Sequence, residues 1–316
     1  MLVKKWIIHS LAQNIINLLP NKLSYKVYFW VQLKFGRVNK KEAISYLTTS
    51  LLVKRYCDNH ERKDKSILEL GTGRTITTLI GLWILGFDKM ITIDLNPYLS
   101  EELTRKDINN ILANSNEIFE LYKNDLGKEE FDTKISLLSA LKDQEFAEIL
   151  KSLSIQYYPY QDARKLDFVE TSSVGIYFSN QVLEHISYDI LKGIFQEGKR
   201  VLVENGLFIH FIGLHDHFAT IDSSISKINF LKYSNFKWNI LAGNKFMYHN
   251  RLRSTDYLEL FERYQYPVVK MDTLVDSRSL DLLENGFKLN PQFEKYKKED
   301  LATFDCKIVS ENFLHK

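Results

Sequence analysis

The stretch Ser66-Ile-Leu-Glu-Leu-Gly-Thr-Gly-Arg-Thr75 constrains the fold of this chain more than any other. A short apolar run that ends in closely spaced glycines and continues into a helical pattern predicts a strand, a tight turn and a helix. Such a unit opens many nucleotide-binding α/β domains. Gly71 and Gly73 lack Cβ atoms, so the turn can take positive φ and a ligand can approach its backbone amides.

A second strand is predicted at Ile91-Thr-Ile93, and it ends in Asp94 followed by Leu95. A carboxylate at the end of this strand can accept hydrogen bonds from both hydroxyls of a ribose. The two strands together therefore predict a site for a cofactor that contains ribose.

The glycine spacing distinguishes between two classes of cofactor. A dinucleotide fingerprint requires a third glycine where this chain has Ile76, and the acidic Glu69 before the turn suits a cationic ligand better than a pyrophosphate. These residues resemble the class I S-adenosylmethionine-dependent methyltransferases, whose motif is an acidic residue, x, Gly, x, Gly, x, Gly. Glu69, Gly71 and Gly73 match that motif, and Thr75 departs from it at the last glycine.

The resemblance implies roles for further residues. Glu69 and the Gly71-Thr72-Gly73 turn would receive the methionine part of S-adenosylmethionine, and Asp94 would receive the ribose, with Leu95 as a further cofactor-binding residue. The resemblance also implies that Asp162 and Ala163 lie at the adenine. Asn180 and Gln181 would lie beside the methyl donor.

A strand at Val174-Gly-Ile-Tyr-Phe178 continues into Ser179-Asn-Gln-Val-Leu-Glu-His185. This segment resembles the family pattern of a strand, a polar loop and then Val-Leu-Glu-His. We interpret Glu184 and His185 as structural, with the imidazole holding the loop by a hydrogen bond to backbone, although a catalytic role stays open.

The expected fold is an α/β, Rossmann-like sheet of seven strands, mostly parallel, with an antiparallel last strand at its edge. Residues 1–60 are expected to form a helical cap and 61–316 the methyltransferase domain, with insertions at about 100–150 and 213–265. The first insertion is expected to lie over the mouth of the site. The further strands are predicted at Ser154–Tyr158, Leu207–Ile212, Tyr266–Met271 and Asp305–Ser310.

The N-terminal segment is helical in pattern. Apolar residues recur at helical spacing from Ile7 to Leu18, with polar residues on the other side, and Pro20 ends the run. A cap that packs on the domain is one interpretation. The other is a membrane-surface segment, because Lys4-Lys-Trp6 and Tyr28-Phe-Trp30 combine basic and aromatic residues. Polar residues interrupt every apolar run, so no transmembrane span is predicted.

Composition narrows the class of protein. The formal net charge of +2 over 316 residues gives no support to nucleic-acid binding. Cys57 and Cys306 lie far apart and lack metal-binding spacing, which favours a reduced, cytoplasmic protein. We assign no metal site from the sequence, and the oligomeric state stays open.

Residues 213–265 are expected to bind the substrate, because ligands of open α/β sheets bind beyond the carboxyl ends of the strands. His215, Asp216 and His217 are the candidate catalytic residues. One histidine is a candidate general base, the pair is a candidate metal site with Asp222, and a purely structural role is the third alternative. Two arginines are candidates either for binding an anionic substrate or for structural ion pairs: Arg251 and Arg253.

The expected function is methyl transfer from S-adenosylmethionine to a small molecule, at a hydroxyl of a sugar, a nucleotide sugar or a related metabolite. The layout resembles bacterial methyltransferases that accompany surface-polysaccharide biosynthesis. Two alternatives remain: an NAD(P)-dependent oxidoreductase with a Rossmann fold, which Ile76 argues against, and a cofactor-binding scaffold without turnover.

Overall fold

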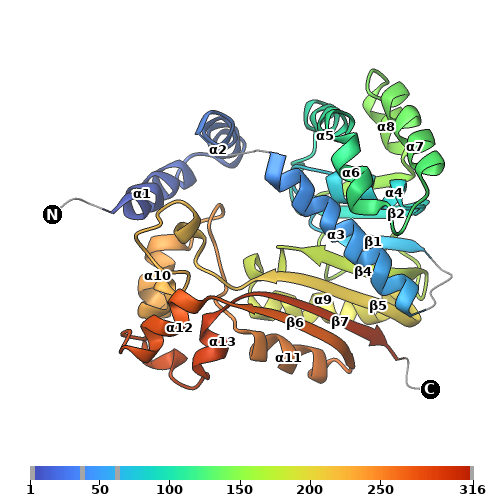
Figure 1. Ribbon diagram of the computed structural model, residues 1–316. Helices are drawn as coiled ribbons and strands as arrows, with labels where there is room; N and C mark the ends of the chain where they lie inside the picture. Colours follow the sequence, from blue (N-terminus) through green and yellow to red (C-terminus); the bar gives the residue numbers. More distant parts are fainter. Residues whose placement is uncertain (1–3, 36–39, 61–64, 314–316) are drawn as a thin grey trace.

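The computed structural model describes residues 4–35, 40–60 and 65–313, and in these ranges the chain forms a seven-stranded sheet (Figure 1). The strand order is β3-β2-β1-β4-β5-β7-β6. The strands are β1 Ser66–Leu70, β2 Lys89–Asp94, β3 Ile155–Pro159, β4 Val174–Asn180, β5 Leu202–Gly213, β6 Val268–Val275 and β7 Thr303–Asn312.

Strands β1 to β5 pair in parallel, and β7 pairs antiparallel with both β5 and β6. This order confirms the predicted fold class, a mostly parallel seven-stranded α/β sheet whose last strand is antiparallel. The position of the last strand was predicted wrongly, because β7 lies inside the sheet and β6 forms the edge. The burial explains the difference, since Cys306, Ile308 and Val309 of β7 are buried whereas β6 is almost wholly exposed.

Helices cover both faces of the sheet. Alternate strand residues point to opposite faces, so Ile67, Ile176 and Ile209 join α3 and α4 in one apolar cluster. Their neighbours Leu68 and Tyr177 join α9 and α11 in another (Figure 1). The helices are α1 Lys5–Asn17, α2 Asn21–Phe35, α3 Lys40–Asn59, α4 Thr77–Ile84, α5 Glu101–Ala113, α6 Ser115–Tyr122, α7 Lys128–Leu141, α8 Phe146–Ser152, α9 Tyr188–Val201, α10 Asn235–Ala242, α11 Ser254–Arg263, α12 Ser277–Glu284 and α13 Lys298–Ala302.

The insertion at about 100–150 forms α5 to α8 and packs beside α3 and α4. Its buried residues, among them Ile108, Phe131 and Ile149, belong to the same apolar cluster as those helices. It therefore extends the core of the domain. Asp107 of α5 accepts hydrogen bonds of 2.8 Å from the Ile76 amide and from the Thr75 hydroxyl. The insertion thus supports the end of the glycine turn.

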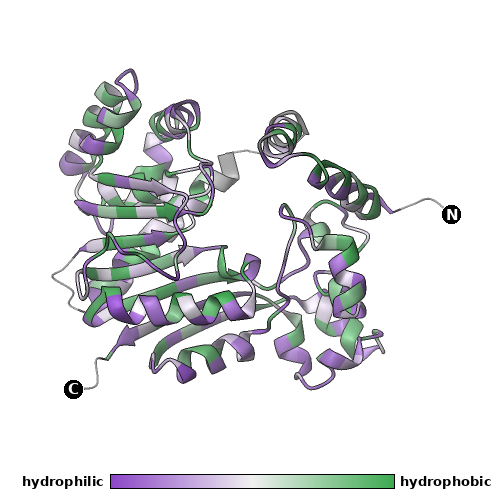
Figure 2. Ribbon diagram, turned by 180° about the vertical axis from the view of Figure 1, so that it is seen from behind, coloured by the Kyte–Doolittle hydropathy of each residue, from purple (hydrophilic) through white to green (hydrophobic). Residues whose placement is uncertain are grey.

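Helix α1 packs on the domain through its polar side. Trp6, Ser10 and Gln13 are buried, and the Ser10 hydroxyl donates to the carbonyl of Leu241 in α10 at 2.5 Å. Its apolar side faces solvent. Figure 2 shows that much of this helix consists of hydrophobic residues. None of the helices in the described ranges combines the length and apolar character needed to cross a bilayer.

A third apolar cluster fills the region after β5. Phe218, Phe230 and Trp238 pack there with Leu283 of α12 and with Trp6 of α1. The N-terminal helix and the insertion at 213–265 therefore share one core beyond the carboxyl ends of the parallel strands.

Candidate active site

The glycine turn follows β1 at the carboxyl edge of the sheet. Gly71 has φ +86° and Gly73 has φ +62°, values that favour glycine. A Cβ on Gly71 would come within 2.4 Å of Val182, whereas one on Gly73 would meet nothing within 4 Å. Gly71 is therefore required by packing inside the protein, and the space at Gly73 is free for a ligand.

Asp94 braces the turn from the end of β2. Its two carboxylate oxygens accept hydrogen bonds from the Gly73 amide at 2.9 Å and from the Asn96 amide at 2.8 Å. Burial raises the pKa of this carboxyl above its usual value. Each oxygen keeps a second lone pair that can accept a bond from a ligand hydroxyl. Leu95 lies next to it with 68% of its surface exposed, an apolar side chain available to a ligand ring.

Glu69 lies buried beneath the turn. The Thr92 hydroxyl donates to its Oε2 at 2.6 Å and lies 2.7 Å from the Thr72 hydroxyl. Burial raises the pKa of Glu69 to about 8, and the nearby Asp94 carboxylate also raises it. A cationic group bound beside Glu69 would favour its ionised form.

The residues implied for adenine follow β3, next to the end of β2, because the Gln161 amide bonds the Asp94 carbonyl at 3.0 Å. Asp162 is largely exposed and pairs with Arg164 at 2.5 Å. The hydrogen bond from Arg164 lowers the pKa of Asp162. Ala163 is buried in the core. Of these two, Asp162 alone presents a side chain to solvent at this edge.

Asn180 and Gln181 follow on the neighbouring strand. Asn180 ends β4, and Gln181 takes a positive φ of +56° while its amide donates to the Phe211 carbonyl at 2.8 Å. A Cβ on Gly213 would come within 2.3 Å of the Gln181 amide oxygen and 2.9 Å of Glu184 Oε1. The side chains of Gln181 and Glu184 therefore gather at the end of β5, close to Gly213.

Histidines from three segments meet beyond this edge. His215 and His217 follow β5, and their rings stack with centroids 4.9 Å apart. His185 ends the short 3-10 helix Leu183–His185, and its ring centroid lies 5.0 Å from that of His217. His249 packs edge-on against His217 at 5.1 Å. The residues predicted as catalytic thus lie beside the Val-Leu-Glu-His segment.

Hydrogen bonds to backbone orient three of these imidazoles. In His185, Nδ1 lies 2.8 Å from the Tyr248 carbonyl. In His217, Nδ1 lies 3.0 Å from the His215 carbonyl. In His215, Nδ1 lies 3.3 Å from the Phe304 carbonyl. A carbonyl only accepts, so Nδ1 carries the proton and Nε2 presents a lone pair. The bond predicted for His185 to backbone is present. Burial lowers the pKa of His215 and of His217, the latter to about 3.

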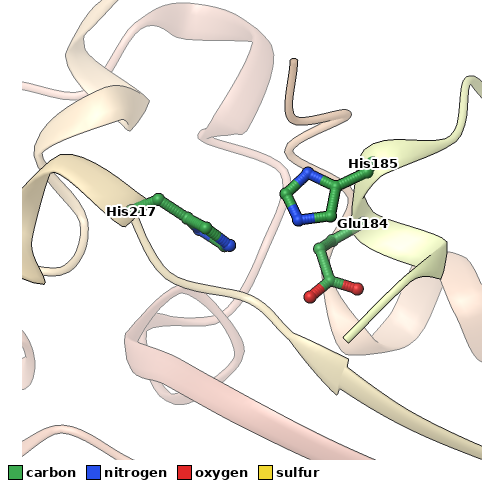
Figure 3. Close-up of side chains that lie close together, drawn as sticks. All are labelled: Glu184, His185 and His217. Carbon is green, nitrogen blue, oxygen red and sulfur yellow. The ribbon is translucent and has the colours of Figure 1, made fainter. Parts of the chain in front are cut away.

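Glu184 lies beneath the imidazoles of His185 and His217 (Figure 3). It is wholly buried, its Oε1 accepts a bond of 3.2 Å from the Gly213 amide, and its Oε2 has no hydrogen-bond partner among the described residues. Burial raises the pKa of Glu184 to about 8. A buried carboxylate oxygen without a partner is costly, so its retention points to a ligand.

The two aspartates of this region have structural roles. Asp216 is wholly buried, and its carboxylate accepts bonds from the Phe218 amide at 2.9 Å and the Asn229 side chain at 3.2 Å. Asp222 accepts bonds from the amides of Trp6 and Ser224. Asp216 is therefore too deeply buried to reach a substrate. Asp222 is hydrogen-bonded to α1, away from the metal site that it was a candidate to form with His215 and His217.

Arg251 and Arg253 are buried and bonded to backbone, which corrects their expected role in substrate binding. Arg253 donates to the Leu214 carbonyl at 2.7 Å and to the Thr303 carbonyl. Arg251 donates to the Phe230 carbonyl at 3.0 Å. Both guanidinium groups hold loops together and face no substrate.

An aromatic group also borders the glycine turn, and no motif of the sequence predicts it. Arg74 lies 5.5 Å from the ring centroid of Tyr98 and 5.9 Å from that of Tyr28 in α2. Tyr28 stacks on Phe246 at 4.2 Å. Helix α2 and the region after β5 therefore meet beside the turn.

Neither a protein-family model nor a curated protein matches this sequence. Solved structures match in fold. A geranyl diphosphate methyltransferase in complex with S-adenosylmethionine is 12% identical over 95% of this chain and 94% of that chain, with a TM-score of 0.42. The CurJ carbon methyltransferase is 12% identical over 90% of this chain and 61% of that chain, with a TM-score of 0.43. The geranyl diphosphate C-methyltransferase from Streptomyces coelicolor A3(2) is 12% identical over 79% of this chain and 72% of that chain, with a TM-score of 0.42. Values this low transfer neither a substrate nor a site residue.

Proposed function

We propose that this protein transfers a methyl group from S-adenosylmethionine to a hydroxyl of a small molecule, such as a sugar or a related metabolite. The observation that carries the proposal is the turn between Gly71 and Gly73. Asp94 accepts a hydrogen bond from this turn, Glu69 lies buried beneath it, and the space next to Gly73 is free. This arrangement suits a ligand with a ribose diol and a cationic amino acid end.

The chain's own residues bind and orient the two reactants. Asp94 accepts the ribose hydroxyls, Leu95 packs on the adenine ring, and Glu69 with the turn amides receives the amino acid end. When bound, the cofactor supplies a methyl group on a sulfonium, which an oxygen displaces in line. Alignment of the two reactants lowers the activation barrier by roughly several kcal/mol.

The imidazoles after β5 serve the acceptor. His215 and His217 each present an unprotonated Nε2, so each can take the hydroxyl proton as the new O–C bond forms. They follow β5 at the carboxyl edge of the sheet that also carries the glycine turn, two strands from β1, and ligands of such sheets bind at this edge. The candidate base supports a hydroxyl acceptor, because a hydroxyl must lose its proton as the new O–C bond forms.

Binding of S-adenosylhomocysteine tests the cofactor assignment. Thermal unfolding and titration calorimetry of the full chain should show stabilisation and saturable heat with S-adenosylhomocysteine, and neither with NAD(P). The reverse pattern would replace the methyltransferase by an oxidoreductase. Absence of both signals would remove the proposal.

The acceptor is tested with labelled S-adenosylmethionine and a panel of sugars, nucleotide sugars and other hydroxyl metabolites. An accepted substrate should gain label at oxygen, and His215→Ala or His217→Ala should slow its turnover at least tenfold, roughly. Methyl transfer to nitrogen, or a turnover rate that neither variant lowers, contradicts the assignment of these histidines as the general base. Binding of S-adenosylhomocysteine with no accepted substrate would favour the scaffold alternative.

A further inference from the structure

Glu184, His185 and His217 converge on one point, as Figure 3 shows. A carboxylate oxygen and one ring nitrogen from each histidine all lie within 4.8 Å of one another. They come from the loop after β4 and from the segment after β5, so two chain segments hold the group together. We propose that these three residues bind one divalent transition-metal ion.

The lone pairs are already in place for such an ion. Because Nδ1 of His185 and of His217 donates to a backbone carbonyl, Nε2 is the free nitrogen of each ring. Metal-binding histidines commonly make this second hydrogen bond, which fixes the tautomer and the ring orientation. Glu184 Oε2 is buried without a partner in the described part of the chain, and a cation would satisfy it.

The donor set indicates the class of metal. Two imidazoles and one carboxylate suit zinc, iron(II) and similar ions, whereas calcium and magnesium prefer oxygen ligands alone. With metal to ligand distances of about 2.1 Å, ligand atoms of one ion lie about 3–4 Å apart. Binding of the ion would draw the three ligand atoms from their present separations of up to 4.8 Å into that range by side-chain rotation. Three ligands leave coordination positions for another molecule, and the solvent exposure of His185 keeps them accessible.

The metal would act on the acceptor, and this consequence rests on the proposed function. A hydroxyl bound in an open position has a lowered pKa, so it ionises at neutral pH. The oxygen then forms a bond to the methyl carbon as the carbon–sulfur bond breaks, and the proton passes to His215 or to solvent. His217 as a metal ligand is no longer free to act as the base, which leaves that role to His215, stacked beside it and not one of the three ligands. An acceptor with two adjacent oxygens would chelate best.

Metal binding is measured directly on the full chain after chelator treatment. Cobalt(II) should bind with one equivalent per chain and produce visible absorption bands, and zinc(II) should displace it. His217→Ala and His185→Ala should each weaken binding at least tenfold. Glu184→Gln keeps the shape of the buried side chain and should weaken it as well.

Two matched variants serve as controls. His215→Ala removes a neighbouring imidazole, and His60→Ala removes a histidine that pairs with Glu311 elsewhere; neither should change the cobalt stoichiometry. Failure to bind one equivalent, or binding unchanged in both His185→Ala and His217→Ala, overturns the site. Calorimetry with S-adenosylhomocysteine on the metal-free protein separates the two proposals, since cofactor binding needs none of the three residues.

A separate observation concerns the exposed side of α1. Ile8, Leu11, Ile15 and Leu18, which we call the outer α1 face, expose between 55% and 83% of their surfaces. The adjoining α10 exposes Phe236 and Ile240 to a similar degree. Apolar residues thus turn to solvent while the polar side of α1 packs on the domain. Continuous exposed apolar surface of this kind marks an interaction site.

We infer that the outer α1 face binds an anionic lipid surface. Residues 1–41 and 223–255, which include the two helices, contain no Asp or Glu, and lysine recurs throughout both. Lys4, Lys5 and Lys237 are exposed. An apolar helix face bordered by lysines, without nearby acidic residues in sequence, matches the chemistry of an anionic bilayer surface.

Co-sedimentation of the full chain with vesicles tests this inference. Binding should be strong to vesicles rich in phosphatidylglycerol, weak to pure phosphatidylcholine, and reduced by salt. Leu11→Ser/Ile15→Ser should lower the bound fraction several-fold. Leu137→Ser/Leu274→Ser, which alters comparably exposed residues on α7 and β6, should not. No binding by the unaltered chain, or a dimer that only the first variant dissociates, overturns the lipid assignment.

Discussion

The Gly73 amide donates a 2.9 Å hydrogen bond to the carboxylate of Asp94, 21 residues later in the chain. One side chain therefore holds the turn in its positive-φ conformation and also presents oxygens at the site proposed for the ribose. The support of the turn and the recognition of the ligand depend on the same carboxylate.

Replacing Asp94 by Asn should weaken ligand binding at this site and leave the rest of the fold intact. The amide keeps one acceptor, but its NH₂ group faces a backbone N–H, so one turn bond and one ligand bond are lost. Hydrogen bonds to charged groups contribute about 1.5–3 kcal/mol, so affinity for S-adenosylhomocysteine should fall on the order of 10- to 100-fold. Calorimetry measures it, with Asp167→Asn, an exposed partner of Lys165, as the control. Unchanged affinity would contradict the ribose assignment.

The two glycines of the turn should respond differently to alanine. Gly73→Ala adds a methyl group in open space, so it should cost about 1–2 kcal/mol of unfolding free energy from its positive φ and abolish cofactor binding. Gly71→Ala also drives a Cβ into Val182 and should cost about 1–3 kcal/mol more. Denaturant unfolding checks both values. Val182→Ala should recover part of the stability of Gly71→Ala and none of the binding of Gly73→Ala.

The buried Glu69 should make stability depend on pH. Its folded pKa of about 8 lies above its ordinary value of 4.5, so between these values the folded state holds a proton that the unfolded state has released. The free energy of unfolding should therefore fall as pH rises through this window, by up to about 1.4 kcal/mol per pH unit. Glu69→Gln cannot ionise, so its free energy of unfolding should lack this slope. The measurement covers pH 5 to 8, roughly the window of the shift. An identical slope in both proteins would place the titration elsewhere.

Arg253 should affect stability and not substrate affinity. Its guanidinium donates to the carbonyls of Leu214 and Thr303, and Arg253→Met would leave these buried acceptors without partners. The expected loss is at least about 3 kcal/mol of unfolding free energy, measured by denaturant unfolding. Exposed Arg278→Met, which loses one bond to the Ser223 carbonyl, should cost far less. A normal unfolding free energy with a raised KM would restore the role in substrate binding.

The sheet and the cofactor turn were predictable because their signals are local. The positions of β1, β2 and β4 follow from apolar runs bounded by turn residues, and the conformation of Gly71 and Gly73 follows from the absence of a Cβ. The place of Asp94 at the carboxyl edge follows from parallel pairing of β1 with β2. Each of these inferences depends on a few neighbouring residues.

Tertiary packing decided what no local pattern encodes. Whether an arginine faces substrate or backbone depends on which carbonyls come within reach, and for Arg253 those belong to Leu214 and Thr303, far away in sequence. The side of α1 that is buried depends on the hydrogen bonds that α10 offers to Ser10. By itself the sequence determined the strands, the glycine turn and its bracing carboxylate. The fold alone brought Glu184 and His185 to His217, because only sheet pairing sets the distance between the ends of β4 and β5.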